Sequence, residues 1–159
     1  MSQKSILFVC LGNICRSPMA EGVFNKLIFE KKIYENFIVD SAGLIAYHQG
    51  ELRDSRMRAH AARRGYNLTH RSRPVKAADF EKFDLIIGMD DQNIRGLMNL
   101  ARTLEQTAKI RRMTDFCVNL MATEVPDPYY GGEQGFEYVI DLLEDACDGL
   151  LKSISPRPL

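Results

Sequence analysis

The sequence predicts a doubly wound α/β domain, in which a four-stranded parallel sheet carries helices on both faces. Short apolar runs, typical of buried strands, alternate along the chain with segments whose apolar residues recur at helical spacing. This alternation implies right-handed crossovers between parallel strands. The length of 159 residues suits a single domain over 1–159, and we find no repeat, low-complexity segment or linker that would divide it.

The first half of the chain supplies two strands and two helices. SILFV at 5–9 is a short continuous apolar run, as expected for a parallel strand covered on both faces. A Ser-Pro start signal precedes a helix from Pro18, in which apolar residues recur every three or four positions. Residues 37–41 form the second strand, and a helix over 53–64 ends at Gly65.

The second half of the chain repeats this alternation. DLIIGM at 84–89 is the third strand, and 92–102 form the helix that follows it. Residues 109–113 make a weak fourth strand. The final helix, over 134–152, carries a clear apolar stripe and leaves 153–159 as a loose tail. Four strands wound in this way form a flavodoxin-like sheet.

Composition excludes several classes of protein. Hydrophobic residues make up 45% and charged residues 26% of the chain, the balance of a soluble globular protein. Twenty-one basic against 21 acidic residues argue against a general nucleic-acid binder, and the N-terminus is too polar for a signal peptide or a membrane span. Four irregularly spaced cysteines do not form a secreted disulfide scaffold. We therefore expect a cytoplasmic protein with no nucleic-acid partner and no membrane insertion, and a monomer as the simplest oligomeric state.

A motif between the first strand and the first helix indicates an anion site. VCLGNICRSP, at 9–18, places Cys10 at the carboxyl end of the strand, where doubly wound sheets bind ligands. Backbone N–H groups of the loop can surround an anion at the positive end of the following helix, and Gly12 and Asn13 allow the backbone angles that this requires. Arg16 adds a planar fork for two phosphate oxygens. The predicted phosphate-binding loop after the first strand consists of Cys10, Leu11, Gly12, Asn13, Ile14, Cys15, Arg16 and Ser17.

The same loop carries a candidate nucleophile. The positive field favours the thiolate of Cys10, the reactive form of cysteine, and Ser17 is placed to donate a hydrogen bond to the sulfur. No lysine followed by serine or threonine closes the loop, so a nucleotide-binding P-loop with magnesium does not fit. A buried strand-end cysteine and a solvated arginine would explain Cys-x5-Arg alone. The glycine, asparagine, serine and proline around them favour the phosphate loop.

VCLGNICRSP resembles the signature of the low-molecular-weight protein tyrosine phosphatases, and the resemblance reaches over nearly the whole chain to DPYYG at 127–131. It implies an enzyme that hydrolyses phosphotyrosine in proteins or peptides through a phosphocysteine intermediate, releases inorganic phosphate and needs no metal or other cofactor. In that family the first cysteine attacks phosphorus and the arginine binds phosphate, which are the roles implied for Cys10 and Arg16. The asparagine and serine that hold the loop correspond to Asn13 and Ser17.

Cleavage of a phosphate ester also needs a proton donor opposite the nucleophile. VPDPYYGG offers Asp127 between Pro126 and Pro128, which restrict the backbone on both sides. Asp-Pro alone is an ordinary turn signal, but Tyr129 and Tyr130 beside it are hard to explain by core packing and offer a wall for an aromatic ring. The resemblance assigns Asp127 as general acid for the tyrosyl oxygen and then as the base for the hydrolytic water.

The resemblance also assigns supporting positions. Ser41, after the second strand, falls where the family has a serine that hydrogen-bonds to the loop asparagine. His70 and Arg73 fall on the family's His-x-x-Arg segment, so His70 is expected to support the loop. Tyr47 falls where a variable, often aromatic residue faces the substrate. Tyr47 therefore joins Tyr129 and Tyr130 in the expected wall for the aromatic ring of the substrate.

The remaining cysteines and histidines have plainer interpretations beside functional ones. Cys15 is either a redox partner that protects Cys10 in a reversible disulfide or a buried loop cysteine. Cys147 falls on the apolar stripe of the last helix and is assigned to the core. The three histidines do not approach cysteine pairs at zinc-binding spacing, so we expect no metal site.

Charge is distributed unevenly along the neutral chain. Residues 53–76 are strongly basic and residues 124–148 are strongly acidic. Such stretches are usually solvated faces. The functional alternative is that the basic stretch attracts anionic phosphopeptides.

Two other functions compete with tyrosine phosphatase activity. One class of arsenate reductases shares this loop, but it relays oxidation through additional cysteines near the third strand, where FEKFDLIIGMDDQN has none. A noncatalytic phosphate-binding module would need neither the nucleophile Cys10 nor the acid Asp127. A comparison of phosphotyrosine hydrolysis with arsenate-dependent thiol consumption separates these three functions.

Overall fold

The computed structural model describes residues 3–45, 50, 54–69, 71–128 and 132–155, and these contain the predicted four-stranded sheet. Its strands are β1 Lys4–Cys10, β2 Phe37–Gly43, β3 Leu85–Gly88 and β4 Ile110–Arg112. They are parallel to their neighbours and lie in the order β2-β1-β3-β4. Because β1 lies between β2 and β3, the chain winds in both directions from its first strand. The carboxyl end of β1 therefore lies where the sheet changes direction, which is the usual ligand site of such folds.

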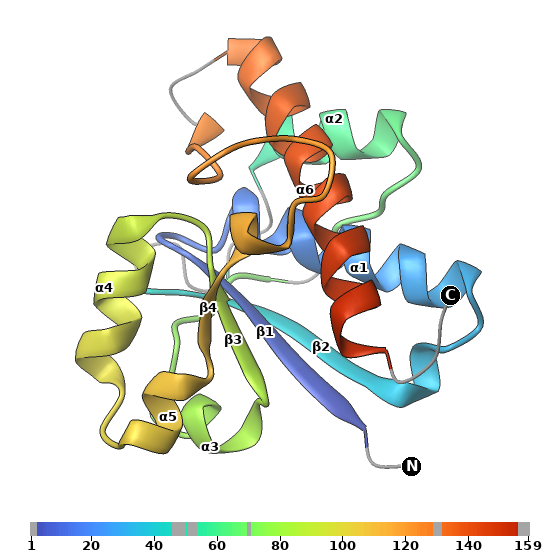
Figure 1. The fold of residues 1–159 in the computed structure, drawn as a ribbon. Coiled ribbons are helices and arrows are strands. Elements are labelled where there is room, and N and C mark those ends of the chain that lie inside the picture. Colours follow the sequence, from blue (N-terminus) through green and yellow to red (C-terminus); the bar gives the residue numbers. More distant parts are fainter. Residues whose placement is uncertain (1–2, 46–49, 51–53, 70, 129–131, 156–159) are drawn as a thin grey trace.

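Helices cover both faces of the sheet, as predicted. Figure 1 shows α1 Arg16–Glu30 and α6 Gly132–Ile154 on one face, and α3 Asp79–Lys82, α4 Asp91–Leu100 and α5 Leu104–Ala108 on the other. Alternate side chains of β1 supply the two cores: Phe8 packs with α1 and α6, whereas Val9 packs with the side of α3 and α4. No described helix is long and apolar enough to cross a membrane.

The elements differ from the predicted ones mainly in length. The helix α2 Ser55–Arg63 and the strands follow the predicted positions within two residues, and α1 begins at Arg16 rather than Pro18. The short helices α3 and α5, and two 3-10 turns at Tyr34–Asn36 and Met113–Phe116, were not predicted. They are too short to show a helical period in the sequence.

The expectation of a loose tail over 153–159 is wrong at its start. The helix α6 continues to Ile154, because Leu150 and Leu151 are buried and keep its last turn against the core. Ser153 lies in that last turn, where its hydroxyl donates to the Leu150 carbonyl. Residues 156–159 lie outside the described part of the chain.

The basic and acidic stretches meet between α2 and α6. The Arg64 guanidinium donates hydrogen bonds to three carboxylates of α6, with distances of 2.7 Å to Glu137, 2.8 Å to Asp141 and 2.8 Å to Glu144. The Tyr66 hydroxyl donates a further bond of 2.5 Å to Glu144. These contacts neutralise part of the charge asymmetry of the sequence within the molecule. They also hold α2 against α6.

Candidate active site

The predicted phosphate loop joins β1 directly to α1. Cys10 is the last residue of β1, and Arg16 is the first residue of α1; both are buried, each with 3% of its surface exposed. Asn13 takes the left-handed backbone angle expected of it, with φ 56°. Gly12, for which the same freedom was expected, has no positive φ. The turn therefore depends on the asparagine for its unusual backbone angle.

A glycine of β2, which the sequence did not single out, makes room for the loop. A Cβ atom at Gly43 would lie 3.0 Å from the backbone of Leu11, Gly12 and Asn13. Just beyond it, the N–H groups of Leu44 and Ile45 donate hydrogen bonds of 3.0 Å to the Cys10 and Leu11 carbonyls. The loop is thus held close against the end of β2, and a side chain at position 43 would push it away.

A chain of hydrogen bonds links the Cys10 sulfur to the end of β2. The Cys10 Sγ lies 3.0 Å from the Ser17 Oγ. The Asn13 amide donates to both the Ser17 Oγ, at 2.9 Å, and the Ser41 Oγ, at 3.0 Å, and Ser41 donates onward to Glu21 at 2.6 Å. Because Ser17 accepts from Asn13, its own hydroxyl proton can go to the sulfur or to the Ala42 carbonyl, and the sulfur is the nearer of the two, at 3.0 Å against 3.4 Å.

Arg16 is held from behind by an aspartate that sequence reasoning missed. Its Nη1 donates to the Asp90 Oδ2 at 2.6 Å and to the Val125 carbonyl at 2.9 Å. Burial alone would lower the pKa of Arg16, but the Cys10 sulfur and the Asp90 carboxylate outweigh burial and raise that pKa. The guanidinium therefore stays charged. Asp90 directly follows the third predicted strand, and this position at the ligand-binding edge was the signal that could have identified it.

The fold brings the predicted acid to the same place from more than one hundred residues away. The Asp127 carboxylate, 38% exposed, lies 3.9 Å from the Arg16 Nη2. The segment before it is fixed to β3 by a hydrogen bond of 2.8 Å from the Val125 N–H to the Met89 carbonyl. Asp127 thus faces the phosphate loop from a segment that is anchored on both Met89 and Arg16.

The segment before Asp127 also has a carboxylate anchor at its other end. Asp145 of α6 accepts hydrogen bonds from the backbone N–H groups of Val118, Asn119 and Leu120, the shortest at 2.8 Å. Burial alone would raise the pKa of Asp145, but these N–H donors outweigh burial and lower it. Its ionised carboxylate therefore fixes this stretch of the segment to α6.

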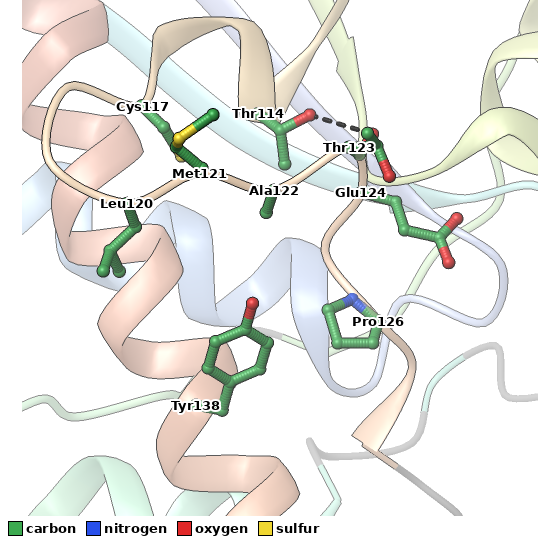
Figure 2. A pocket seen from close by; sticks show the side chains of 9 residues that line it. All are labelled: Thr114, Cys117, Leu120, Met121, Ala122, Thr123, Glu124, Pro126 and Tyr138. Carbon is green, nitrogen blue, oxygen red and sulfur yellow. Dashed lines mark hydrogen bonds between the residues drawn. The ribbon is translucent and has the colours of Figure 1, made fainter.

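The segment and α6 line an open, mainly apolar pocket of about 670 Å³ (Figure 2). Figure 2 shows Tyr138 opposite Pro126, with Leu120 and Cys117 above them. None of the predicted site residues that the structure describes lines this pocket. Its described lining comes from residues between 114 and 126 and from Tyr138 of α6, and includes no residue of the phosphate loop.

Arg73 supports the loop in a way that the sequence did not specify. Its backbone N–H donates to the Asn13 Oδ1 at 3.0 Å, and its carbonyl accepts from Gly43 at 2.8 Å. Its guanidinium is held by Asp40 and Asp79. Burial alone would lower the pKa of Arg73, but these two carboxylates raise it. Four other predicted residues lie outside the described part of the chain: Tyr47, His70, Tyr129 and Tyr130.

The other cysteines are protonated thiols at neutral pH. Burial, followed by the charge of Asp54, raises the pKa of Cys15, and burial raises that of Cys147 in the core. Burial also raises the pKa of Cys117 to about 11. Among the residues that the structure describes, no three His, Cys, Asp or Glu side chains gather as metal ligands would.

This fold and this loop, with a cysteine at the end of β1 and an arginine at the start of α1, are the arrangement expected of an α/β phosphatase. The family model for low molecular weight phosphotyrosine protein phosphatases matches residues 5–157. This chain therefore belongs to that family, whose members are hydrolases.

Known relatives match over more than nine-tenths of the chain. The chain is 41% identical to a low molecular weight protein-tyrosine-phosphatase of Streptomyces coelicolor over 94% of this chain and 92% of that protein. It is 39% identical to the human low molecular weight phosphotyrosine protein phosphatase over 94% of each chain. A solved structure of a protein tyrosine phosphatase from Entamoeba histolytica has 49% identity and a TM-score of 0.93, over 96% of this chain and 97% of that one.

Proposed function

We propose that this chain hydrolyses phosphotyrosine in proteins or peptides through a phosphocysteine intermediate and without a metal ion. The observation that carries the proposal is the arrangement of Cys10, Arg16 and Asp127. Cys10 ends β1, its sulfur interacts electrostatically with the Arg16 guanidinium, and the Asp127 carboxylate approaches that guanidinium within 3.9 Å. Nucleophile, electrostatic stabiliser and proton donor thus stand at one place.

In the first step the Cys10 thiolate attacks phosphorus. The S–P bond forms as the bond from phosphorus to the tyrosyl oxygen breaks, and Asp127 gives its proton to that oxygen. The Ser17 hydroxyl, 3.0 Å from the sulfur, stabilises the thiolate before attack. Tyrosine leaves as the neutral phenol.

In the second step water replaces the sulfur. Asp127, now ionised, takes a proton from the water as the oxygen attacks phosphorus and the S–P bond breaks. Inorganic phosphate leaves, and Cys10 returns to the thiolate. The loop N–H groups and Arg16 stabilise the equatorial oxygens in both steps through a charge distribution that is already in place.

Hydrolysis of a phosphotyrosine peptide in the presence of EDTA tests this proposal. We expect turnover that vanadate and alkylation inhibit, and we expect Cys10→Ser to lower kcat by about 10⁴-fold or more because the nucleophile is lost. Phosphate affinity of this variant should persist, since the loop and Arg16 remain. Full activity of Cys10→Ser would remove the nucleophile from the proposal, and arsenate-dependent thiol consumption without hydrolysis would favour the reductase.

We also propose that Cys15 protects Cys10 from irreversible oxidation. The Cys10 thiolate attacks peroxide, the O–O bond breaks, and a sulfenic acid and hydroxide form; the Cys15 thiol then attacks the sulfenic sulfur, the S–S bond forms and water leaves. Because the pKa of Cys15 is raised, formation of the Cys10–Cys15 disulfide should accelerate as pH rises.

The four cysteines, all within the described residues, are free thiols, which supports a reducing, cytoplasmic setting.

Recovery after peroxide treatment tests this role of Cys15. We expect dithiothreitol to restore most activity of the unchanged chain and little activity of Cys15→Ser, whose Cys10 proceeds to sulfinic acid. Equal recovery of both proteins would assign Cys15 to packing alone.

A further inference from the structure

A second pocket lies between α2 and the first turn of α6. It has a volume of about 320 Å³ and is lined by Arg56, Ala59, His60, Arg63, Gly132, Glu133 and Phe136. The N–H of Asp54, which caps α2, donates a hydrogen bond of 2.9 Å to the carbonyl of Ile14 in the loop. Figure 1 shows α2 beside the N-terminal end of α6. The pocket therefore flanks the active site on one side.

The base of this pocket is rigid. Phe136 is buried, with the His60 ring stacked on it at 5.3 Å between centroids and the Arg56 guanidinium 5.0 Å from its centroid. The buried His60 is held in turn by a hydrogen bond between its Nδ1 and Glu137. Because these groups fix one another, a ligand would find the pocket already formed.

The rim of the pocket is mainly cationic. Arg56 and Arg63 line it with one acid, Glu133, but Arg56 is ion-paired with Asp54 at 3.2 Å, so Arg63 is the cation of this lining that a ligand can reach. Arg63 is exposed, and among the described residues its side chain makes one contact of 3.5 Å with the His60 ring and no ion pair. The neighbouring Arg64 contrasts with it, since three carboxylates of α6 occupy its guanidinium. Arg63 thus keeps donors that a carboxylate can accept.

We propose that this pocket is a substrate subsite, which takes an acidic side chain a few residues from the phosphotyrosine and on one side of it only. The inference rests on the proposed phosphatase function and adds the substrate class. Arg63 would bind the carboxylate with its fork, and the aliphatic part of the substrate side chain would lie against Ala59 in the pocket. Arg56 and Arg63 lie two helical turns apart, about 10 Å, which corresponds to about three residues of extended peptide.

The experiment measures kcat/KM on a set of phosphotyrosine peptides. Each peptide carries one glutamate at a different position on either side of the phosphotyrosine and is otherwise uncharged. We expect about fivefold to tenfold higher kcat/KM for glutamate at the favoured positions on one side, relative to the glutamate-free peptide. Arg63→Gln should reduce this ratio to below about twofold. Glu133→Gln should increase it, because the competing acid is gone.

Arg58→Gln is the matched control. Arg58 is exposed on the opposite face of α2, two residues after Arg56, and its replacement changes the net charge as Arg63→Gln does. General attraction of anionic peptides would fall equally in both variants, whereas a local subsite responds only to Arg63. An equal response, or an equal preference on both sides of the phosphotyrosine, would overturn the subsite.

The failure of the subsite and that of the phosphatase function are distinguishable. If all peptides are hydrolysed at the same rate, the phosphatase proposal stands and the subsite is wrong. If none is hydrolysed, the phosphatase proposal is wrong. The subsite is then tested separately, by measuring how tightly fluorescently labelled versions of the same peptides bind to the Cys10→Ser variant. Tighter binding of the peptides with glutamate on one side would still support the subsite, provided that Arg63→Gln abolishes this preference. Equal binding of all peptides would overturn the subsite.

Discussion

Arg16 and Arg64 both lie against carboxylates, yet their guanidinium groups are used differently. Arg16 is 3% exposed and makes its hydrogen bonds through Nη1, to Asp90 and Val125. Its Nη2 donates no hydrogen bond among the described residues and lies 3.9 Å from Asp127. Arg64 is 25% exposed and distributes both of its Nη nitrogens over three carboxylates of α6.

The difference teaches that unused donors, and not the charge, mark the arginine of an anion site. Burial alone would lower the pKa of both residues. The Cys10 sulfur and Asp90 outweigh burial at Arg16, and Glu137 and Asp141 outweigh it at Arg64, so both pKa values are raised. The direction of the pKa shift therefore does not distinguish Arg16 from Arg64. The geometry does, because Arg16 is anchored by one nitrogen and Arg64 by two.

Exchanging each arginine for lysine is the sharpest way to break this comparison. Arg16→Lys should lower kcat/KM by about 10³-fold, because an ammonium cannot both hold Asp90 and offer a fork to the phosphoryl oxygens. Arg64→Lys should change kcat/KM by less than about twofold, since Arg64 makes only structural contacts. Steady-state kinetics on a phosphotyrosine peptide measures both, and similar losses in the two variants would contradict the distinction.

Asp127→Asn tests the proton donor beside Arg16. We expect kcat to fall by about 10²-fold or more on phosphotyrosine, because the leaving oxygen departs without a proton. The loss should be smaller on p-nitrophenyl phosphate, whose leaving group needs less protonation. Glu124→Gln, an exposed acid of the same segment, is the control and should keep normal kinetics. A loss independent of the leaving group would argue against the acid role.

Asp90→Asn sharpens the comparison by loosening the anchor of Arg16. We expect kcat/KM to fall by about tenfold, as expected for loss of one hydrogen bond between charged groups. Vanadate should bind more weakly by a similar factor, since Arg16 is no longer oriented. Asp91→Asn, at the neighbouring exposed aspartate that pairs with Arg112, should leave both values unchanged. Normal vanadate affinity in Asp90→Asn would show that the loop alone orients Arg16.

At Arg64 the expected effect is on stability. Arg64→Ala should lower the free energy of unfolding by about 1 kcal/mol, because its partners on α6 are 38% to 54% exposed and such pairs contribute little each. Urea denaturation measures this change, with Arg58→Ala as the exposed control. A loss of activity at unchanged stability would give Arg64 a role that its contacts do not show.

The pH dependence of this stabilisation has a definite sign. Hydrogen bonds from Arg64 and then His60 hold the pKa of Glu137 below its ordinary value of 4.5. The folded chain therefore binds this proton less readily than the unfolded chain, so the pairing stabilises the fold above that ordinary value and weakens as pH falls through the lower folded pKa. Glu137→Gln should be less stable than the unchanged chain near neutral pH. The difference should shrink below about pH 4.

Much of the fold was predictable because its main elements carry unbroken local patterns. The apolar run of β1 and the apolar stripe of α6 fix the identity of each element without reference to the rest of the chain. The helices α3 and α5 were missed, since four or five residues show no period. The end of α6 was misplaced because burial of its last turn depends on the core that it joins.

The phosphate loop was predictable for a similar reason. The proposed nucleophile, the proposed phosphate-binding arginine and the left-handed asparagine stand within seven consecutive residues, so the sequence alone determined the residues on which the proposed site rests. Only the tertiary structure decided what surrounds that loop. Gly43 and Asp90 matter because the ends of β2 and β3 lie beside β1, and Asp127 because its segment is fixed to Met89. Contacts between strands that are distant in the chain leave no local pattern, because they arise from packing and not from neighbouring residues.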